Sequence, residues 1–579
     1  MPFEGGRAEH TMNNVIQAYA EIASDFVAEN APFAMRDATA NGRKARVYLH
    51  AAGNLPVVFA DIETQFPSRN LTWEDGNATT YAEIFAHAKQ LGAGLQDKFA
   101  IRPGDPVGLV MSNRTEWFIA FIAITWIGGI AVLFNSRGTK DELAAAISTI
   151  GCAVIIADEK RAALLDASDE KMRIILAAAS PGRITPHINM ADLMGVRMAD
   201  SVDSEPDMPA AILFTSGTTG RPKGAVLTHR NLTNMVRNLQ FLSAAGLNFM
   251  AQQTGIDSDT LRQMVPPTNT LLVSPLFHIS GITAFFSTAL AGGTLTLVER
   301  WRPQAALPLI ASNRITMLSG PPLIVSDLLD QEGAVEQMAT LNNIAVGGQA
   351  TPSSLMVRVA RALPMAGQSV GWGMTEVCGS VSAASGAIFA AQPNSSGLLS
   401  PLIDLRVVDD EGRDLPIGEC GELWLRGGLV MQGYWNDADA TEAAFDGDWY
   451  KTGDIGFFDP AGFVFIVDRK KDMVICGGEN IYCAEVERVL SKDEAFSEIS
   501  VFGVPDERAG ERVVAAVTLR EGYARAEDDV KEHLRSDLAA YKIPSAVIFD
   551  LGPFPRNAAG KINKAMLRAI YLERLVESV

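Results

Sequence analysis

Residues 215–225 read T-S-G-T-T-G-R-P-K-G-A and directly follow an apolar run at residues 210–214. This pattern predicts a short buried strand that leads into a loop rich in hydroxyl groups and glycine. Glycine adopts positive φ easily, which lets backbone N–H groups turn toward an anion, and a lysine adds positive charge. We therefore predict a phosphate-binding loop made of Thr215, Ser216, Gly217, Thr218, Thr219, Gly220, Lys223 and Gly224.

This loop differs from the two commonest nucleotide-binding motifs. A Walker loop requires Ser or Thr after Gly-Lys, but Lys223 is followed by Gly224, and Lys561 of the other Gly-Lys pair is followed by Ile562. The sequence at residues 371–376, G-W-G-M-T-E, ends in glutamate where a Rossmann fingerprint needs a small residue. A flexible linker is the plain alternative for such a composition, but the preceding strand and the lysine disfavour it.

Length and composition bound the class of protein. A chain of 579 residues is too long for one core, so we expect two or more domains. The net charge of −19 argues against a nucleic-acid partner, which needs a basic face. The seven histidines are dispersed, so no zinc-type cluster is predicted. The five cysteines are scattered without C-x-x-C pairs and indicate reduced thiols, which favours the cytoplasm: Cys152, Cys378, Cys420, Cys476 and Cys483.

One apolar segment has the length of a membrane span. Residues 117–134 are uncharged and long enough to be a candidate for a transmembrane helix. Two glycines at residues 128–129 divide the segment, so we expect a helix up to residue 127 followed by a buried strand at residues 130–134. The charged N-terminus predicts no signal peptide. Peripheral membrane contact and a homodimer stay open.

The order of the expected elements predicts an α/β protein. Apolar strands alternate with amphipathic helices between residues 80 and 299, which favours mainly parallel sheets covered by helices. Short strands around a turn at residues 409–412 predict a small antiparallel β unit. A second compact α+β pattern follows a charged crossing. We therefore expect an N-terminal domain at residues 1–468 and a small C-terminal domain at residues 469–579.

Four further motifs make the interpretation of the phosphate-binding loop more specific. They are G-W-G-M-T-E at 371–376, which we expect to form one short loop, Y-K-T-G-D at 450–454, D-R-K-K-D at 468–472 followed by G-G-E-N, and P-R-N-A-A-G-K-I at 555–562. Each alone has a plain structural explanation, such as a core tryptophan or a solvated lysine. In this order and spacing they resemble the adenylate-forming superfamily of acyl-CoA synthetases, luciferases and peptide-synthetase adenylation domains. The resemblance covers about residues 80–564. It departs at Trp372, where tyrosine is more frequent, and at Cys483, where many relatives have proline.

The resemblance implies an AMP-forming acyl-CoA synthetase that uses ATP, Mg²⁺ and CoA. Such an enzyme joins a carboxylic acid to the α-phosphate of ATP, releases pyrophosphate, and transfers the acyl group to CoA with release of AMP. The substrate supplies the nucleophile, so catalysis rests on alignment and electrostatics. The implied catalytic residues are Lys561, Thr375, Glu376 and His278.

The resemblance also assigns individual roles. Trp372 stacks on adenine, Thr375 bonds the α-phosphate, and Glu376 binds Mg²⁺. Asp454 holds the ribose with Arg469 nearby, and Lys561 stabilises charge between the carboxylate and the α-phosphate. Further implied nucleotide-binding residues are Gly348, Gln349, Gly371, Gly373 and Met374.

A second half-reaction implies movement of the C-terminal domain. Family members rotate this domain about one hinge position, which corresponds to Lys471. The rotation removes Lys561 and brings in a loop that lines the pantetheine tunnel, made of Gly477, Gly478 and Glu479.

The motif L-F-H-I-S-G at residues 276–281 resembles the acyl pocket of acyl-CoA synthetases. It gives His278, Ile279 and Gly281 as pocket residues, with Gly379 beside them, and His278 as a gate. Amino-acid-activating relatives carry an aspartate there, so an α-amino acid is disfavoured. The glycines predict a roomy neutral pocket for a medium- or long-chain fatty acid, or for an aromatic or alicyclic acid such as a steroid side chain. Transfer to a carrier protein, a luciferase-type oxygenase and a non-catalytic scaffold are the remaining alternatives.

Overall fold

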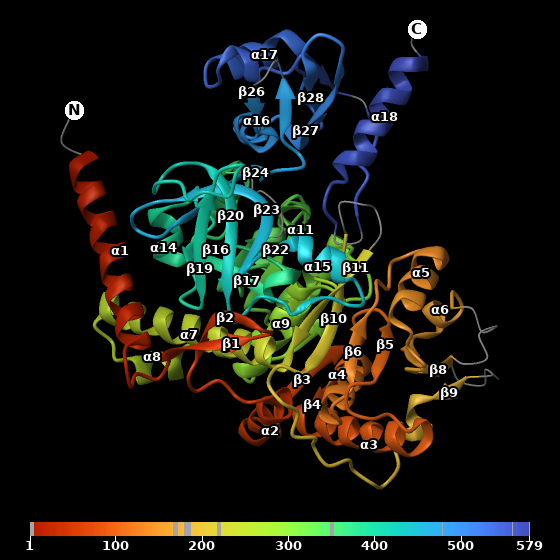
Figure 1. Cartoon of the computed structure of the whole chain (residues 1–579). Coiled ribbons are helices and arrows are strands. Elements are labelled where there is room, and N and C mark those ends of the chain that lie inside the picture. The colour runs from red at the N-terminus through yellow and green to blue at the C-terminus, as the bar shows by residue number, and fades with distance from the viewer. Residues whose placement is uncertain are drawn as a thin grey trace.

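The computed structural model describes residues 5–165, 172–178, 187–216, 222–347, 353–476, 479–549, 551–557 and 560–577. A large N-terminal domain of mixed sheets and helices lies below a small C-terminal domain, drawn in blue (Figure 1). The α/β class and the two-domain organisation predicted from the sequence are confirmed.

Two large sheets build most of the N-terminal domain within the described residues. Both are mainly parallel and carry antiparallel strands at their edges. The first runs in the order β21 (Gly433–Tyr434), β11 (Pro222–Thr228), β10 (Pro209–Ser216), β6 (Ile130–Leu133), β5 (Pro106–Val110), β7 (Val154–Ala157), β8 (Arg173–Leu176) and β9 (Ile188–Asn189). The second runs in the order β18 (Leu398–Leu399), β17 (Gly379–Ser385), β16 (Gly367–Met374), β15 (Asn343–Gly347), β14 (Met317–Gly320), β12 (Thr270–Leu272), β13 (Leu295–Leu297), β3 (Asn70–Glu74) and β4 (Asn77–Thr80).

Smaller antiparallel sheets complete the fold. The predicted antiparallel β unit consists of β19 (Ile403–Val408), β20 (Gly421–Gly427), β23 (Trp449–Phe458), β22 (Phe445–Asp446) and β24 (Val464–Arg469). The C-terminal sheet consists of β26 (Glu479–Ile481), β25 (Val474–Cys476), β28 (Gly510–Leu519), β27 (Phe496–Asp506) and β29 (Ala546–Ile548). A hairpin near the N-terminus pairs β1 (Met35–Ala40) with β2 (Arg43–Tyr48).

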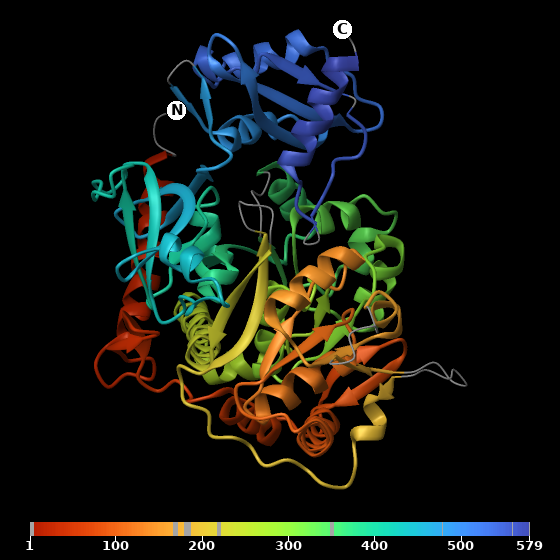
Figure 2. The same cartoon turned by 45° about the vertical axis from the view of Figure 1, so that its right-hand side comes forward.

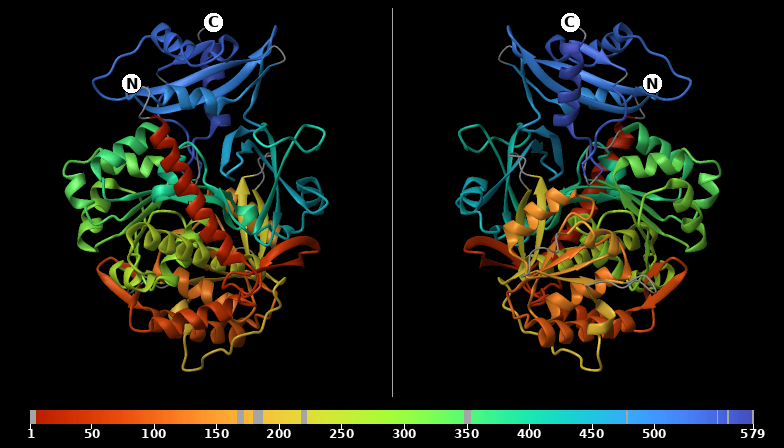
Figure 3. Two further views of the ribbon diagram at one scale, coloured as in Figure 1. Left: turned by 90° about the vertical axis from the view of Figure 1, so that its left-hand side faces the viewer. Right: turned by 90° about the vertical axis from the view of Figure 1, so that its right-hand side faces the viewer.

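Helices cover the sheets of both domains. Those of the N-terminal domain are α1 (Gly5–Val27), α2 (Leu55–Gln65), α3 (Tyr81–Phe99), α4 (Thr115–Trp126), α5 (Lys140–Ile150), α6 (Glu159–Ala162), α7 (His229–Thr254), α8 (Ser258–Met264), α9 (Ile279–Leu290), α10 (Pro303–Ser312), α11 (Pro322–Leu329), α12 (Ala334–Gln337), α13 (Ser353–Ala362), α14 (Gly386–Ala391) and α15 (Ala438–Ala444). The C-terminal domain carries α16 (Cys483–Leu490), α17 (Glu527–Arg535) and α18 (Lys564–Glu577). Helix α1 runs along one side of the molecule and packs on α7 and α14 (Figure 3).

Local sequence signals explain where several helices begin. The Thr80 hydroxyl accepts a hydrogen bond from the N–H of Glu83, and the Glu83 carboxylate accepts one from the N–H of Thr80. This capping box starts α3, and Thr139 with Glu142 starts α5 in the same way. Each box satisfies backbone donors that the first helical turn leaves unpaired.

The apolar segment at residues 117–134 is core. From Trp117 to its end, helix α4 is buried, and Trp117 stacks on Phe121 with ring centroids 5.0 Å apart. Strand β6 follows, which confirms the predicted helix and strand. Across the described part of the chain, no helix combines the length and the apolar character needed to span a membrane.

Two local predictions were wrong. Gly224 does not lie in the phosphate loop with positive φ, because β11 begins at Pro222 and pairs antiparallel with β10, which puts Gly224 opposite Phe214. A Cβ at Gly224 would lie 2.9 Å from Ile212 Cγ2, so this glycine serves close packing within the sheet. Residues 371–374, predicted to lie in a loop, form the end of strand β16.

Candidate active site

The candidate site lies where the N-terminal domain faces the C-terminal domain. The β10–β11 hairpin points toward the C-terminal domain, and the chain before α18 descends to meet the N-terminal domain (Figure 2). Strand β16 ends nearby at Met374 and is followed by a short 3₁₀-helix at Thr375–Val377. Strand ends from both large sheets are therefore placed to contact one ligand.

Glu376 is a partly buried carboxylate beside hydroxyl groups. The Tyr434 hydroxyl donates to Glu376 Oε1 at 3.3 Å. Burial raises the pKa of Glu376, while the hydroxyl groups of Thr215 and Tyr434 oppose the rise. Such a carboxylate gains from a cation beside it, and carboxylate and hydroxyl oxygens suit Mg²⁺. Within the described residues, no group of three or more His, Cys, Asp or Glu side chains is placed to hold a metal.

Asp454 is oriented by an indole and a guanidinium. Strands β23 and β24 pair so that Asp454 lies opposite Arg469, whose Nε is 2.9 Å from Asp454 Oδ1. The Trp372 Nε1–H donates to Asp454 Oδ2 at 2.7 Å. Asp454 Oδ1 accepts no hydrogen bond from the described residues, although the side chain is only 3% exposed. A buried acceptor with spare capacity fits a ribose hydroxyl, which can donate to it.

Lys561 reaches this site from the C-terminal domain. Burial lowers the pKa of Lys561 and repulsion by Arg469 lowers it further, while Asp454 and Glu376 act in the opposite direction. The amine of Lys561 therefore shares one electrostatic neighbourhood with Arg469, Asp454 and Glu376. The family resemblance implied that these residues act at one site.

The turn that carries Lys561 is held by its own residues. The N–H of Lys561 donates to Asn557 Oδ1 at 3.0 Å, and its carbonyl accepts from the N–H of Asn557 at 2.8 Å. Arg556 donates to the carbonyl of Gly560 at 2.8 Å and also pairs with Glu498 of β27. These contacts fix the turn to the C-terminal sheet, so Lys561 moves with the whole domain.

His278 is a neutral imidazole beside the same site. It precedes α9, and its Nε2 is buried without a hydrogen-bond partner among the described residues. Burial, together with the positive charges of Lys561 and Arg137, lowers the pKa of His278 to about 4. His278 is therefore uncharged at neutral pH.

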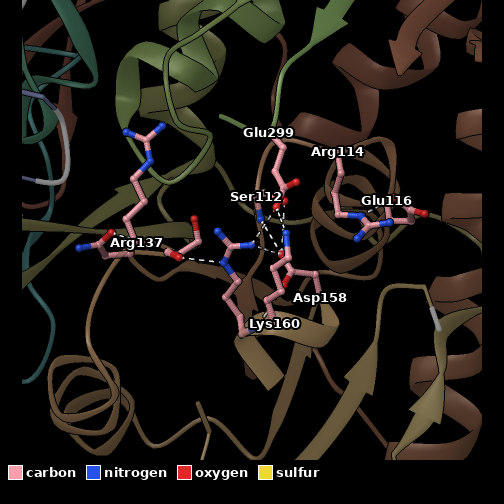
Figure 4. A network of polar contacts seen from close by, with 10 residues as sticks. Ser112, Arg114, Glu116, Arg137, Asp158, Lys160 and Glu299 are labelled. Carbon is pink, nitrogen blue, oxygen red and sulfur yellow. Dashed lines mark hydrogen bonds and ion pairs between the residues drawn. The ribbon is translucent and has the colours of Figure 1, made fainter. Parts of the chain in front are cut away.

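Arg137, which follows β6, was not predicted from the sequence. The loop that carries it is anchored by Arg161, whose Nε donates to the carbonyl of Ser136 at 2.9 Å while its Nη1 lies 3.1 Å from Asp158 Oδ2 (Figure 4). The signal available in the sequence was a cationic residue just after the carboxyl end of a parallel strand, where α/β sheets bind ligands.

Gly379, one of the residues predicted for the acyl pocket, begins β17 and lies close to side chains of α7 and α9. Gly379 has φ +111°, and a Cβ there would lie 3.1 Å from Thr283 Oγ1, 3.7 Å from Ile279 Cγ1 and 3.8 Å from Met235 Sδ. Met235 and Thr283 were not predicted from the sequence. A Cβ at Gly281 would lie 2.4 Å from the Pro275 carbonyl oxygen, so Gly281 permits close packing of α9 on the preceding turn.

The other predicted residues fall in several places. Lys223 lies on β11 with its Nζ 5.1 Å from the centroid of the Tyr434 ring, and Gly373 on β16 leaves no room for a side chain. Lys471 lies in the turn between β24 and β25, and Glu479 begins β26. Outside the described residues lie Gly217, Thr218, Thr219, Gly220, Gly348, Gln349, Gly477 and Gly478, together with the side chain of Ser216.

Comparisons with known proteins cover nearly the whole chain. The family described as AMP-binding enzyme matches residues 59–435, and the family described as AMP-binding enzyme C-terminal domain matches residues 485–561. A long-chain-fatty-acid–CoA ligase of Mycobacterium tuberculosis is 31% identical over 500 residues, covering 85% of this chain and 93% of that protein.

Two further similar proteins are named for acids that contain rings. A 7a-methyl-1,5-dioxo-octahydro-1H-inden-4-yl propanoyl:CoA ligase of Mycobacterium tuberculosis is 35% identical over 483 residues, covering 81% of this chain and 90% of that protein. The O-succinylbenzoate coenzyme A synthetase of Bacillus subtilis, solved in complex with ATP and magnesium ion, has a TM-score of 0.71 at 27% identity. It covers 88% of this chain and 98% of that chain.

Proposed function

The chain belongs to the AMP-binding enzyme family as an AMP-forming acid–CoA ligase, and from this premise we propose that its acid is a medium- or long-chain fatty acid. In the first half-reaction the acid carboxylate attacks the α-phosphate of ATP, and pyrophosphate leaves. In the second, the CoA thiol attacks the acyl carbonyl of the acyl-adenylate, and AMP leaves as the thioester forms.

The uncharged surroundings of Gly379 carry the proposal about the acid. Met235, Ile279 and Thr283 approach this position to within 3.1–3.8 Å of an added Cβ, and none carries a charge. A second carboxylate or an ammonium group on the acid would be buried there without a counter-ion, which is costly. An apolar tail instead gains from leaving water.

Adenylation is assigned to residues of both domains. Lys561 places positive charge between the two reacting anions, where negative charge develops as they join. Asp454 accepts hydrogen bonds from the ribose, Trp372 presents a flat aromatic surface to adenine, and Thr375 bonds the α-phosphate. Glu376 would hold Mg²⁺, which supplies positive charge to the phosphate oxygens. The support is the convergence of Lys561 with Glu376 and Asp454.

Thioester formation requires Lys561 to leave. We place the domain boundary between residues 468 and 469, with Lys471 as the hinge and residues 477–479 along the path of the CoA arm. The backbone N–H of Lys470 donates to the carbonyl of Gly453 at 2.8 Å, which ties the residue before the hinge to the N-terminal domain. Uncharged His278 then acts as a gate beside the acyl carbonyl, because it adds no positive charge that would hold the departing AMP phosphate.

An aromatic or alicyclic acid is the second candidate, favoured by the relatives that act on ring-containing acids. Transfer of the acyl group to a carrier protein is the alternative for the second half-reaction. Both alternatives use the same adenylation chemistry. The first differs from the main proposal only in the part of the acid beyond its carboxylate, and the second only in the molecule that accepts the acyl group.

A coupled assay of pyrophosphate release with CoA tests the proposal. The acids are decanoate, palmitate, ferulate, benzoate and a steroid-side-chain acid, with the Lys561→Ala variant as the inactive control. We expect kcat/KM for decanoate or palmitate to exceed that for the ring-containing acids by about tenfold or more. A higher kcat/KM for a ring-containing acid would replace the fatty acid, and pyrophosphate release without acyl-CoA would favour a carrier protein.

A further inference from the structure

Two acidic side chains lie near the C-terminal end of α11. Asp327 and Asp330 are three residues apart, at and just beyond the end of the helix, so they lie on one face. This helix is near the top of the N-terminal domain, beneath the C-terminal domain (Figure 1). Neither residue belongs to the nucleotide or acyl site described above.

Asp330 is shared between the two domains. Its Oδ1 lies 2.6 Å from Arg358 Nη2 of α13, within the N-terminal domain. Its Oδ2 lies 3.6 Å from Arg520 Nη1, which follows β28 of the C-terminal domain. One carboxylate therefore binds a fixed guanidinium with one oxygen and a guanidinium of the other domain with the second.

Asp327 is a second, fixed carboxylate on the same helix. Its Oδ2 accepts a hydrogen bond from Trp301 Nε1 at 2.7 Å, which fixes the carboxylate. Burial raises the pKa of Asp327, and the positive charge of Arg556 opposes the rise, so Arg556 lies within electrostatic range. Arg556 in turn holds the carbonyl of Gly560, next to Lys561.

The surroundings of Asp330 suit a contact that forms and breaks. A carboxylate at the C-terminal end of a helix is unfavourable, because the last carbonyl groups are also negative. Arg358 compensates for this charge whether or not the C-terminal domain is present. When domain rotation removes Arg520, Asp330 therefore keeps Arg358 as its partner. The ion pair with Arg520 is partly exposed to solvent, so breaking it costs only a modest free energy.

We propose that Asp330 and Arg520 dock the C-terminal domain in the orientation that brings Lys561 to the adenylation site. They are positioning residues, because they act on the reaction only through the placement of Lys561. This inference rests on the two half-reactions assigned above. It adds that this ion pair sets the fraction of molecules ready for the first one.

Half-reaction kinetics test the docking. Adenylation is measured with decanoate and MgATP without CoA, and thioester formation with purified decanoyl-adenylate and CoA. We expect Asp330→Asn to slow adenylation about two- to fivefold and to leave thioester formation unchanged or faster. Arg520→Gln should have the same effect, and the double variant should be no slower than either single variant, because both remove one interaction. Salt should slow adenylation less in Asp330→Asn than in the wild type.

Arg358→Gln is the matched control, because it removes the other partner of the same carboxylate without touching the C-terminal domain; its adenylation rate should not fall. Equal slowing of both half-reactions in Asp330→Asn, or additive effects in the double variant, would overturn the proposal.

Hydrogen–deuterium exchange in MgATP gives a readout that needs no acid. Asp330→Asn should exchange faster than wild type over residues 551–562, and Arg358→Gln should not. Unchanged exchange in Asp330→Asn would overturn the docking. If the wild type adenylates none of the acids tested, the proposed substrate class is contradicted. The exchange rates of the variants and the wild type in MgATP still test the docking, because that measurement uses no acid.

Discussion

Trp372 and Asp454 are joined by a hydrogen bond of 2.7 Å from the indole Nε1 to Oδ2, although 82 residues separate them along the chain. The aromatic side chain that we assign to adenine therefore also fixes the carboxylate that we assign to the ribose. The second oxygen, Oδ1, is left without a hydrogen bond among the described residues. Trp372 stands where tyrosine is more frequent in the family, and its indole N–H makes the hydrogen bond that orients Asp454.

Trp372→Phe should weaken the use of ATP. The change keeps an aromatic ring but leaves Asp454 Oδ2 buried and unpaired, which costs about 1–3 kcal/mol. We expect the KM for ATP to rise about tenfold and the KM for the acid to change little. Trp424→Phe is the matched control, because Trp424 Nε1 is buried without a partner among the described residues. An unchanged KM for ATP in Trp372→Phe would contradict this role.

Stability should fall in mild acid because of buried histidine. The Nδ1 of His229 accepts the N–H of Leu55 at 3.2 Å, and burial lowers the pKa of His229 to about 4 from 6.5. The unfolded chain binds this proton at higher pH, so stabilisation present above pH 6.5 is lost as the pH falls toward 4. One such group changes the free energy of unfolding by about 1.4 kcal/mol per pH unit.

Urea unfolding between pH 7 and pH 5 measures this effect. His229→Gln should flatten the pH dependence, whatever its effect at pH 7. His50→Gln, at an exposed position, should leave the slope unchanged. The same slope in His229→Gln and wild type would show that His229 is not held neutral by the fold.

Met235→Ala should lengthen the preferred acid. Removing the thioether opens space beside Gly379, at a cost of about 2–5 kcal/mol in stability because Met235 is buried. We expect the ratio of kcat/KM for palmitate over decanoate to rise. Met250→Ala, on the exposed face of the same helix, should leave the ratio unchanged. If Met235→Ala leaves the ratio of kcat/KM for palmitate over decanoate unchanged, the tail of the fatty acid does not lie beside Met235.

Lys471→Pro should separate the two half-reactions. Proline fixes φ near −65°, which restricts rotation about the turn between β24 and β25. We expect adenylation to persist and thioester formation to slow by about tenfold or more, measured separately by rapid quench. Unchanged thioester formation would dismiss Lys471 as the hinge.

The strands and helices with strong local patterns were predictable from the sequence. The helix expected to run up to residue 127 ends at Trp126, and the strand expected at residues 130–134 is β6, Ile130–Leu133. Apolar runs bounded by turn residues carry this information locally.

Other features depend on partners far away in the chain. Gly224 and residues 371–374 contain the glycines typical of loops, yet β-pairing with neighbouring strands decides their conformation. The contacts of Trp372 with Asp454 and of Asp330 with Arg520 join separate motifs, so no local pattern predicts them. The motifs predicted which residues gather at the site, whereas the bonds that orient them required the structure.

The role of Lys561 is tested most directly by measuring both half-reactions of Lys561→Ala with a rapid-quench instrument. We predict that formation of the acyl-adenylate from decanoate and MgATP is abolished. Transfer from supplied decanoyl-adenylate to CoA should proceed at close to the wild-type rate. Equal loss of both half-reactions, or adenylation that survives the substitution, would contradict the claim that this lysine neutralises the joining anions.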